Sequence, residues 1–269
     1  MEQKTILNFC TLFDKNFLLK GLALRNSLSE NCPNFRLFIL CLDNLTYDIL
    51  KKMNLSSAVL LKLEQLGDHE LLDLKNKRKA SEFAWTCKPP LVIHIFNKYR
   101  DVEFLTYFDS DIYLYSSPSA IYEEIKDKSI IITPHRFPEN KKHLEKKSGI
   151  YNAGNIIFRN DDNAIECLKE WRGQCLDWCY DYLDNGRLGD QMYLNNWSEK
   201  YKNVYILNHK GVNLGSWNIS SYRIKKLDAK IYVDDEPLLW YHFHSLKLYE
   251  GIGGEIKTPP VFLINKDIY

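Results

Sequence analysis

The sequence predicts an α/β fold in which a mixed, mainly parallel sheet is flanked by helices. Apolar, β-branched and aromatic runs of strand length alternate along the chain with stretches of helical periodicity. Residues 5–11, the loop after them and residues 18–29 have the patterns of a strand, a connection and a helix, which make half of a βαβ unit. Residues 104–115 have the pattern of a buried strand that is interrupted by Asp109, Ser110 and Asp111.

The remaining elements are predicted in chain order from the same patterns. Residues 35–42 are almost continuously apolar and end at Asp43 and Asn44, which predicts a second strand. The charged run 138–147 is expected to be a solvated loop, or alternatively a segment that covers a site. Further strands are predicted at 58–63, 129–133, 151–158, 204–207 and 240–247, and helices at 47–53, 66–78, 91–99, 120–125, 164–182 and from Asp190 to Asn196.

Composition excludes some classes of function. The chain has 269 residues and a formal charge of +1, so it lacks the basic surplus of a nucleic-acid-binding protein, and we expect no nucleic-acid partner. Its seven cysteines lack paired zinc-ligand spacing and are expected to be reduced thiols in the core. No apolar run reaches about 18 residues and no signal-peptide pattern precedes the first strand, so we expect a cytoplasmic protein.

The carboxylates of Asp109 and Asp111 are the first candidate site. Burying two like charges so close together is unfavourable unless a cation or strong hydrogen-bond donors compensate them. Carboxylate oxygens suit Mg²⁺ or Mn²⁺, and such ions commonly also hold substrate phosphates. The pattern therefore suggests a metal and diphosphate site, with a solvated strand end as the alternative.

Polar residues elsewhere extend this candidate site. Asp14 and Asn16 follow the first strand, at the sheet edge where open α/β proteins bind ligands. His242 and His244 are two residues apart, so on a strand they would face the same way and either could reach the metal. The pair precedes Lys247, whose charge suits a diphosphate.

Three further places in the sequence have both a structural and a functional interpretation. Asp190 stands where a helix is expected to start, so it either caps that helix or contributes to a site. Gly154 within a strand marks either a bulge or the close approach of a ligand. In the irregular segment 211–218, Asn213 is a candidate donor contact, with a tight turn as the alternative.

The order of these motifs resembles that of the GT-A fold glycosyltransferases, and of glycosyltransferase family 8, the lipopolysaccharide galactosyltransferase and glycogenin type, in particular. The matching stretches span roughly 230 residues, which makes them more specific together than any one is alone. They are Asp14-Lys-Asn-Phe17, Asp109-Ser-Asp111, Tyr151-Asn-Ala-Gly154, Gly189-Asp-Gln-Met-Tyr-Leu-Asn195 and Trp240-Tyr-His-Phe-His-Ser-Leu-Lys247.

The resemblance implies a role for each matching residue. Asp109, Asp111 and His242 or His244 would bind the Mn²⁺ or Mg²⁺ ion. Asp190, Gln191 and Asn152 would form the catalytic side of the donor sugar. The donor contacts would be Thr11, Asp14, Asn16, Phe17, Lys88, Ser110, Gly154, Asn213 and Lys247.

The chain departs from the family pattern in two places. The ending His-Phe-x-Gly-x-x-Lys-Pro-Trp becomes His-Phe-His-Ser-Leu-Lys without Pro-Trp, which leaves the choice between His242 and His244 open. Lys88 stands where the family has an arginine. These differences indicate a distant member or a sister family.

The implied function is transfer of a sugar from a nucleotide-diphosphate donor, in particular a UDP-sugar, to a glycan or lipid-linked saccharide. Retention of anomeric configuration, surface polysaccharide or lipopolysaccharide synthesis, and peripheral association with the inner face of the membrane are implied with it. We expect one domain, 1–269, with a nucleotide-binding half of about 1–115 and an acceptor and catalytic half of about 116–269.

Two alternatives remain open at this level. A sugar-nucleotide nucleotidyltransferase would want a glycine-rich phosphate loop after the first strand, and residues 11–16 contain no glycine. A non-catalytic carbohydrate-binding protein on the same fold would be expected to lose the carboxylate pair or its histidine partner, and both are present.

Overall fold

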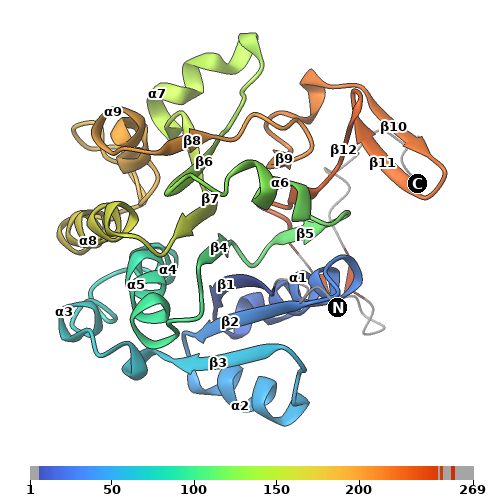
Figure 1. Ribbon diagram of the computed structural model, residues 1–269. Helices are drawn as coiled ribbons and strands as arrows, with labels where there is room; N and C mark the ends of the chain where they lie inside the picture. The colour runs from blue at the N-terminus through green and yellow to red at the C-terminus, as the bar shows by residue number, and fades with distance from the viewer. Residues whose placement is uncertain (1–5, 248, 251–255, 258–269) are drawn as a thin grey trace.

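A computed structural model describes residues 6–247, 249–250 and 256–257 (Figure 1). Its centre is a seven-stranded sheet in the order β3-β2-β1-β4-β7-β6-β8. The strands are β1 (Leu7–Phe13), β2 (Phe35–Cys41), β3 (Ala58–Lys62), β4 (Phe104–Phe108), β6 (Ile130–Pro134), β7 (Tyr151–Arg159) and β8 (Val204–Ile206). All neighbouring pairs are parallel except those made by β7, which runs antiparallel to both β4 and β6. The predicted mixed, mainly parallel sheet flanked by helices is confirmed.

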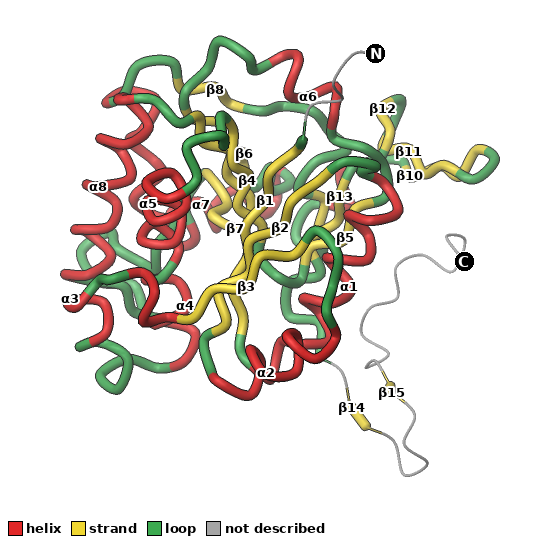
Figure 2. The backbone as a smooth tube through the Cα atoms, turned by 60° about the horizontal axis from the view of Figure 1, so that its bottom comes forward, coloured by secondary structure: helices red, strands yellow, loops and turns green. Residues whose placement is uncertain are grey.

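Helices cover both faces of this sheet. They are α1 (Leu18–Asn31), α2 (Asn44–Met53), α3 (His69–Leu72), α4 (Ala80–Thr86), α5 (Lys88–Lys98), α6 (Ser119–Glu124), α7 (Glu145–Ser148), α8 (Asp162–Asp177) and α9 (Trp197–Lys200). Helices α5 and α8 lie on one side of the sheet, and α1 and α2 lie on the other (Figure 2). Each side has its own apolar core, so the strands between them are buried on both faces.

Aromatic side chains pack in both cores, together with aliphatic ones. Phe158 of β7 contacts Trp171 of α8 and Trp197 of α9, with ring centroids 6.3 and 6.1 Å away. On the other side, the rings of Phe9 and Phe108 stack at 5.7 Å, and Trp240 meets Phe108 edge-on at 5.2 Å. Fully burying each such side chain contributes on the order of 1.5–3 kcal/mol, so these contacts hold β1, β4 and β7 in register.

A second sheet carries the chain's C-terminal part back to the first. It has the order β5-β13-β9 and consists of β5 (Ile112–Leu114), β13 (Trp240–His242) and β9 (Leu214–Gly215). Pairing of β13 with β5 places His242 opposite Ile112, next to Asp111. The remaining strands are β10 (Ile224–Leu227), β11 (Lys230–Val233), β12 (Glu236–Pro237), β14 (Tyr249–Glu250) and β15 (Ile256–Lys257).

Short 3-10 turns connect several of these elements. They are η1 (Lys15–Phe17), η2 (Leu63–Leu66), η3 (Glu139–Leu144), η4 (Met192–Asn196) and η5 (Ile219–Ser221). The charged run 138–147, expected to be a solvated loop, therefore forms η3 and most of α7, and its lysines are exposed.

Two predicted helices are shorter in the structure. The helix expected at 66–78 begins only at His69, because Gly67 adopts a left-handed conformation at φ 64° and Asp68 caps α3, and it ends after a single turn at Leu72. Helix α8 ends at Asp177 instead of continuing to residue 182, and the buried Arg78 donates to its last carbonyls at Cys175 and Leu176. A guanidinium at a helix C-terminus satisfies carbonyls that lack partners and complements the helix dipole.

Two other expectations about the chain concern its cysteines and its helices. All seven cysteines are free and buried, which confirms that they are core thiols. Among the described residues, no helix has both the length and the apolar content that a bilayer crossing requires. Thr5, the first residue of the first predicted strand, lies outside the described residues, and β1 begins at Leu7.

Candidate active site

The two carboxylates lie where strand β4 leaves the central sheet. Strand β4 ends at Phe108 and β5 begins at Ile112, so Asp109 and Asp111 occupy the bend between them. The backbone N–H of Asp109 donates to the carbonyl of Gly154 on β7 at 2.8 Å. The hydroxyl of Tyr107 donates to Asp109 Oδ1, also at 2.8 Å. These contacts fix the position of the Asp109 carboxylate.

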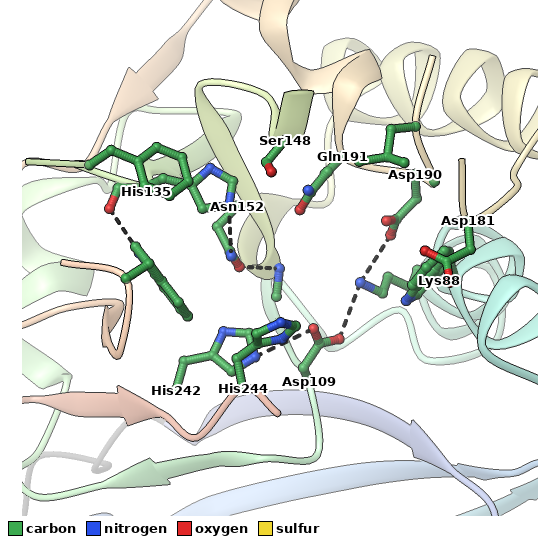
Figure 3. A pocket seen from close by; sticks show the side chains of 16 residues that line it. Lys88, Asp109, His135, Ser148, Asn152, Asp181, Asp190, Gln191, His242 and His244 are labelled. Atoms are coloured by element: carbon green, nitrogen blue, oxygen red, sulfur yellow. Dashed lines mark hydrogen bonds and ion pairs between the residues drawn. The ribbon is translucent and has the colours of Figure 1, made fainter. Parts of the chain in front are cut away.

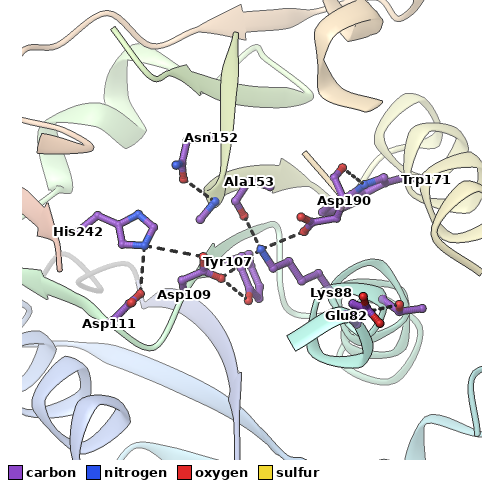
Figure 4. A network of polar contacts seen from close by, with 12 residues as sticks. Glu82, Lys88, Tyr107, Asp109, Asp111, Asn152, Ala153, Trp171, Asp190 and His242 are labelled. Atoms are coloured by element: carbon purple, nitrogen blue, oxygen red, sulfur yellow. Dashed lines mark hydrogen bonds and ion pairs between the residues drawn. The ribbon is translucent and has the colours of Figure 1, made fainter. Parts of the chain in front are cut away.

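His242 completes a cluster with both carboxylates (Figure 4). Its Nε2 lies 3.0 Å from Asp111 Oδ1 and 3.9 Å from Asp109 Oδ2. Burial alone would raise the pKa of Asp111, but the charge of His242 and, to a smaller extent, that of Lys20 lower this pKa to about 2. Burial alone would lower the pKa of His242, but the charge of Asp111 raises it. Each group thus favours the charged form of the other.

The cluster fits a divalent cation. Asp109, Asp111 and His242 each offer one ligand atom, and these atoms lie within 4.8 Å of one another. Two carboxylates and an imidazole are donors that Mn²⁺ and Mg²⁺ sites use. Gly154 keeps the space beside them open, because a Cβ there would lie 2.5 Å from His242 Cε1 and 2.9 Å from Asp109 Oδ2. The residues present therefore suit the ion that the fold class implies.

His244 occupies a different position from His242. Strand β13 ends at His242, and the chain then turns through Ser245, which adopts a left-handed φ of 64°. The predicted strand therefore ends before His244, so strand alternation does not orient the pair, but both histidines line two cavities of the site. The His244 ring nevertheless lies 5.9 Å from the His242 ring, at 88° to it. Of the two, His242 belongs to the three-residue cluster within the described part of the chain.

Lys88 joins the carboxylate cluster to the opposite wall of the site. Its Nζ lies 3.1 Å from Asp109 Oδ1 and 2.9 Å from Asp190 Oδ2, and it donates to the carbonyl of Ala153 at 3.1 Å (Figure 4). The side chain is only 3% exposed. Burial would lower its pKa, but the charges of Asp109 and Asp190 raise it.

The location of Lys88 is unusual for a cation. It is the first residue of α5, whose next two residues are Pro89 and Pro90, as is common at helix starts. A positive charge opposes the helix dipole at that end. The two carboxylates compensate for this and for burial, so Lys88 depends on both of them.

Asp190 is not a helix cap. It lies in a turn, and the following 3-10 turn η4 has no side-chain cap. Instead its carboxylate faces Lys88, and its backbone carbonyl accepts from Trp171 Nε1 at 3.0 Å. Burial raises its pKa despite the nearby ammonium group. Gln191 follows it, and both residues line one cavity of the site.

Two cavities meet at this cluster. The first, of about 330 Å³, is lined by residues that include Lys88, Asn152, Gly154, Asp190 and Gln191 (Figure 3), and is named the sugar-side cavity after the role that the resemblance predicts for them. The second, of about 410 Å³, lies beside the loop after β1 and is named the nucleotide-side cavity for the same reason. The residues common to both are Trp85, Lys88, Asp109, His242 and His244.

Most predicted donor contacts line the nucleotide-side cavity. They are Asp14, Phe17, Ser110 and Lys247, with Lys88 on the shared wall. The carboxylate of Asp14 is held by Asn16, whose backbone N–H and side-chain amide both donate to it at 2.9 Å. Asn16 itself is exposed and does not line the cavity, so it supports Asp14 instead of contacting a ligand there.

Thr11 and Asn213 are not placed to contact a donor. Both have no exposed surface, and neither lines either cavity. Thr11 lies within β1, whose two faces are covered by helices, so its side chain is buried whichever way it points. Asn213 has a left-handed φ of 50° and donates to the carbonyl of Pro134 at 3.3 Å. The tight-turn interpretation of Asn213 is therefore the one that the structure supports.

Several lining residues were missed from the sequence. Lys20 lies 4.0 Å from Asp111 Oδ2 and 4.4 Å from the centre of the Phe17 ring. It follows Phe17 by three residues on one helical turn, and that spacing could have revealed it. Trp85 and Phe137 give the sugar-side cavity aromatic walls, for which no local pattern was available, and Trp217 of the irregular segment 211–218 also lines it.

Comparison with known proteins gives the chain relatives as well as a fold. No family model matches it. YfnD of Bacillus subtilis (strain 168), described as uncharacterized, is 31% identical over 243 residues, which cover 90% of this chain and 78% of YfnD. YfnF of the same organism, also described as uncharacterized, is 34% identical over 247 residues, covering 89% and 82%.

Solved structures with the same architecture are glycosyltransferases. The galactosyltransferase LgtC in complex with donor and acceptor sugar analogs has a TM-score of 0.63 at 13% identity, covering 89% of this chain and 87% of LgtC. Mouse xyloside xylosyltransferase 1 has a TM-score of 0.57 at 13% identity, covering 90% and 98%. The chain thus has the GT-A glycosyltransferase fold, and by its sequence it belongs to the family of YfnD and YfnF.

Proposed function

We propose that this protein is a metal-dependent glycosyltransferase that moves a sugar from a nucleotide-diphosphate donor, a UDP-sugar, to a glycan or lipid-linked saccharide. One observation carries the proposal. The cluster of Asp109, Asp111 and His242 lies where the two cavities meet, with the loop after β1 on one side and Asp190 and Gln191 on the other. A diphosphate at this junction would direct the nucleoside into one cavity and the sugar into the other.

The nucleotide-side cavity supplies groups suited to a nucleoside diphosphate. The carboxylate of Asp14, oriented by Asn16, can accept hydrogen bonds from ribose hydroxyls or a base N–H. The ring of Phe17 is 42% exposed and offers a face on which a base can stack. Lys247 and Lys20 line the same cavity and bring positive charge toward the phosphates.

The divalent ion would be held by Asp109, Asp111 and His242. When bound, such an ion acts as a Lewis acid that stabilises negative charge on the departing diphosphate. Lys88 holds the carboxylate of Asp109 from the side opposite to His242. The lysine thereby keeps that ligand oriented and links it to Asp190.

The sugar-side cavity supplies the groups around the reacting carbon. Asn152 presents an amide, Gln191 a second amide, and Asp190 a buried carboxylate bound to Lys88. An Asp190 carboxylate whose charge is already engaged by Lys88 is a poor nucleophile. We therefore propose retention through attack by the acceptor on the face from which the diphosphate leaves, which is tested by product NMR of the new anomeric bond.

The acceptor would enter along the aromatic walls of the same cavity. Trp85, Phe137 and Trp217 offer faces to the apolar side of a sugar ring, while Asp181 and Ser148 offer hydrogen-bonding groups at its edge. LgtC, which shares the fold, is solved with donor and acceptor sugar analogs together. Action in surface polysaccharide synthesis at the inner face of the membrane is part of this proposal.

The test measures donor binding and turnover together. Wild type, Asp111→Ala and the control Asp127→Ala are melted with a panel of nucleoside diphosphates and nucleotide sugars, in Mn²⁺ and in EDTA, and released nucleoside diphosphate is quantified. Asp127 is an exposed carboxylate, and within the described part of the chain its ion pair is with the adjacent Lys128. A ligand at about 100 times its dissociation constant adds roughly 2.7 kcal/mol of stability.

The expected result is a Mn²⁺-dependent shift and slow release of nucleotide with one nucleotide family. Both should be lost in Asp111→Ala and kept in Asp127→Ala. If no nucleotide shifts the wild type in either condition, the transferase proposal fails. Incorporation of a nucleotide from a nucleoside triphosphate and a sugar phosphate would instead indicate a nucleotidyltransferase.

A further inference from the structure

His135 connects the sugar-side cavity to the segment between residues 135 and 149, which carries η3 and α7. It follows β6 directly, and its ring is buried between Phe137, which stacks on it at 4.9 Å, and Trp217, which meets it edge-on at 5.9 Å. Its backbone N–H donates to the carbonyl of Ile150 at 2.8 Å. His135 and Gly149 thus stand at the two ends of the intervening segment that carries η3 and α7.

A chain of hydrogen bonds runs from this ring to the sugar-side cavity (Figure 3). His135 Nδ1 lies 3.0 Å from the carbonyl oxygen of Gly149. Its Nε2 lies 3.1 Å from Asn152 Nδ2, a contact that Figure 3 shows. At the other end of the Asn152 amide, Oδ1 accepts from the backbone N–H of Gly154 at 2.7 Å. These three hydrogen bonds link Gly149 to Gly154 through the side chains of His135 and Asn152.

The backbone groups at the two ends of this series of hydrogen bonds determine the position of each proton in it. The N–H of Gly154 can only donate, so the atom of Asn152 facing it must be the oxygen, and the amide nitrogen must face His135. An amide nitrogen donates, so His135 Nε2 must accept and carry no proton. The carbonyl of Gly149 can only accept, so Nδ1 must carry the proton. The ring is therefore neutral, with a single tautomer.

This arrangement leaves one amide hydrogen of Asn152 for a ligand. Of the two hydrogens on Nδ2, one is used by His135, and the other has no hydrogen-bond acceptor among the described residues. Asn152 is 7% exposed and lines the cavity. A planar amide held at both its oxygen and one hydrogen has no freedom to turn, so its second hydrogen keeps a fixed direction.

We propose that His135 is a positioning residue that locks the Asn152 amide for sugar binding and ties it to the segment between residues 135 and 149. The inference rests on the proposed function, since it gives Asn152 a donor or acceptor sugar as partner. Burial lowers the pKa of His135 to about 4, which agrees with a neutral ring. Trp217 extends the coupling, because it also meets the His242 ring edge-on at 5.3 Å.

Substitutions separate positioning from mere structural support. His135→Gln keeps one acceptor and one donor at the end of a side chain, whereas His135→Leu keeps neither. Thr133→Val on the same strand removes a comparable buried hydrogen bond, from Thr133 Oγ1 to Asn155 Oδ1 at 2.8 Å. Thr133 pairs with Asn152 through the backbone, but the hydrogen bond that is removed does not involve the Asn152 side chain. This substitution serves as the control for lost stability.

The activity test uses the nucleotide sugar that the wild type turns over, with Asn152→Ala as the reference for a lost amide. His135→Leu should lower kcat by about 10-fold or more, and His135→Gln should restore most of it. Combining His135→Leu with Asn152→Ala should give no further loss beyond Asn152→Ala alone. Thr133→Val should lose stability with kcat nearly unchanged. Multiplicative losses in the double variant, or an unchanged kcat in His135→Leu, would overturn the proposal.

The tautomer gives a readout that does not need activity. Two-bond ¹⁵N–¹H NMR of the histidine rings, assigned with His135→Gln, should show His135 protonated at Nδ1 and bare at Nε2. A proton on Nε2 refutes this inference whatever the activity. A wild type that is inactive with every nucleotide sugar, but whose His135 carries its proton on Nδ1, refutes the proposed function while supporting the hydrogen-bond chain.

Discussion

Gly154→Ala is expected to weaken Mn²⁺ binding by about 10- to 100-fold. A Cβ on residue 154 would lie 2.5 Å from His242 Cε1, 2.6 Å from Asn152 Oδ1 and 2.9 Å from Asp109 Oδ2. Ordinary nonbonded contact is roughly 3.5 Å, so these atoms must move away by about 0.6 to 1 Å. Metal–ligand distances tolerate only about 0.2 Å. The displacement therefore exceeds what the coordination of an ion at Asp109 and His242 can absorb.

The assay for this prediction is calorimetric titration of Mn²⁺ into the variant, with thermal melting to monitor folding. Losses of this order are typical when the groups supporting a metal site are disturbed. Gly173→Ala is the matched control, because a Cβ on that residue of α8 meets nothing within 4 Å. It should stabilise the protein by about 0.5–1 kcal/mol and leave Mn²⁺ affinity unchanged. Equal Mn²⁺ affinity in wild type and Gly154→Ala would refute the assignment of the ion to this cluster.

Two further predictions concern charge. Lys88→Met leaves the carboxylates of Asp109 and Asp190 without their shared cation. It should therefore lower the free energy of unfolding by about 3–5 kcal/mol in denaturant titrations without metal. A loss below about 1 kcal/mol would contradict the buried network. Burial would raise the pKa of the Asp68 carboxyl, but its hydrogen bonds, above all those from Arg172, lower it. The ion pair of Asp68 with Arg172 therefore adds to the free energy of unfolding at neutral pH, and this contribution is lost as the pH falls below about 4. Asp68→Asn, which can still cap α3, should therefore be less stable than wild type by about 1–2 kcal/mol at pH 7, and this difference should shrink as the pH falls below about 4. A difference that does not depend on pH would contradict the ion pair.

The sheet and its carboxylates could be predicted because they are encoded locally. An apolar run that ends in Asp109 and Asp111 predicts a strand and charge at its end, whatever surrounds it. Alternation along the same strand also places Tyr107 and Asp109 on one face, so the hydroxyl contact of Tyr107 was within reach of the sequence. Periodicity likewise gave α1 and β2.

Other features depend on partners that are distant in sequence. Nothing near Lys88 indicates that its ammonium group lies between Asp109 and Asp190, since these come from the bend after β4 and from the turn before η4. The apolar pattern of β7 carries no information on strand direction, yet its antiparallel course brings Gly154 beside Asp109. The role of His135 depends on Gly149 and Asn152 folding back together.

The most direct test of the central claim is the electron paramagnetic resonance signal of free Mn²⁺, titrated with protein in the presence and absence of UDP. The wild type should reduce the free signal, and UDP should tighten binding of the ion, because the diphosphate and the cluster of Asp109, Asp111 and His242 would share it. Asp109→Asn combined with Asp111→Asn should leave the free signal unchanged with or without UDP. Equal Mn²⁺ binding by this double variant and the wild type would contradict the account, because the ion would then lie elsewhere in the molecule.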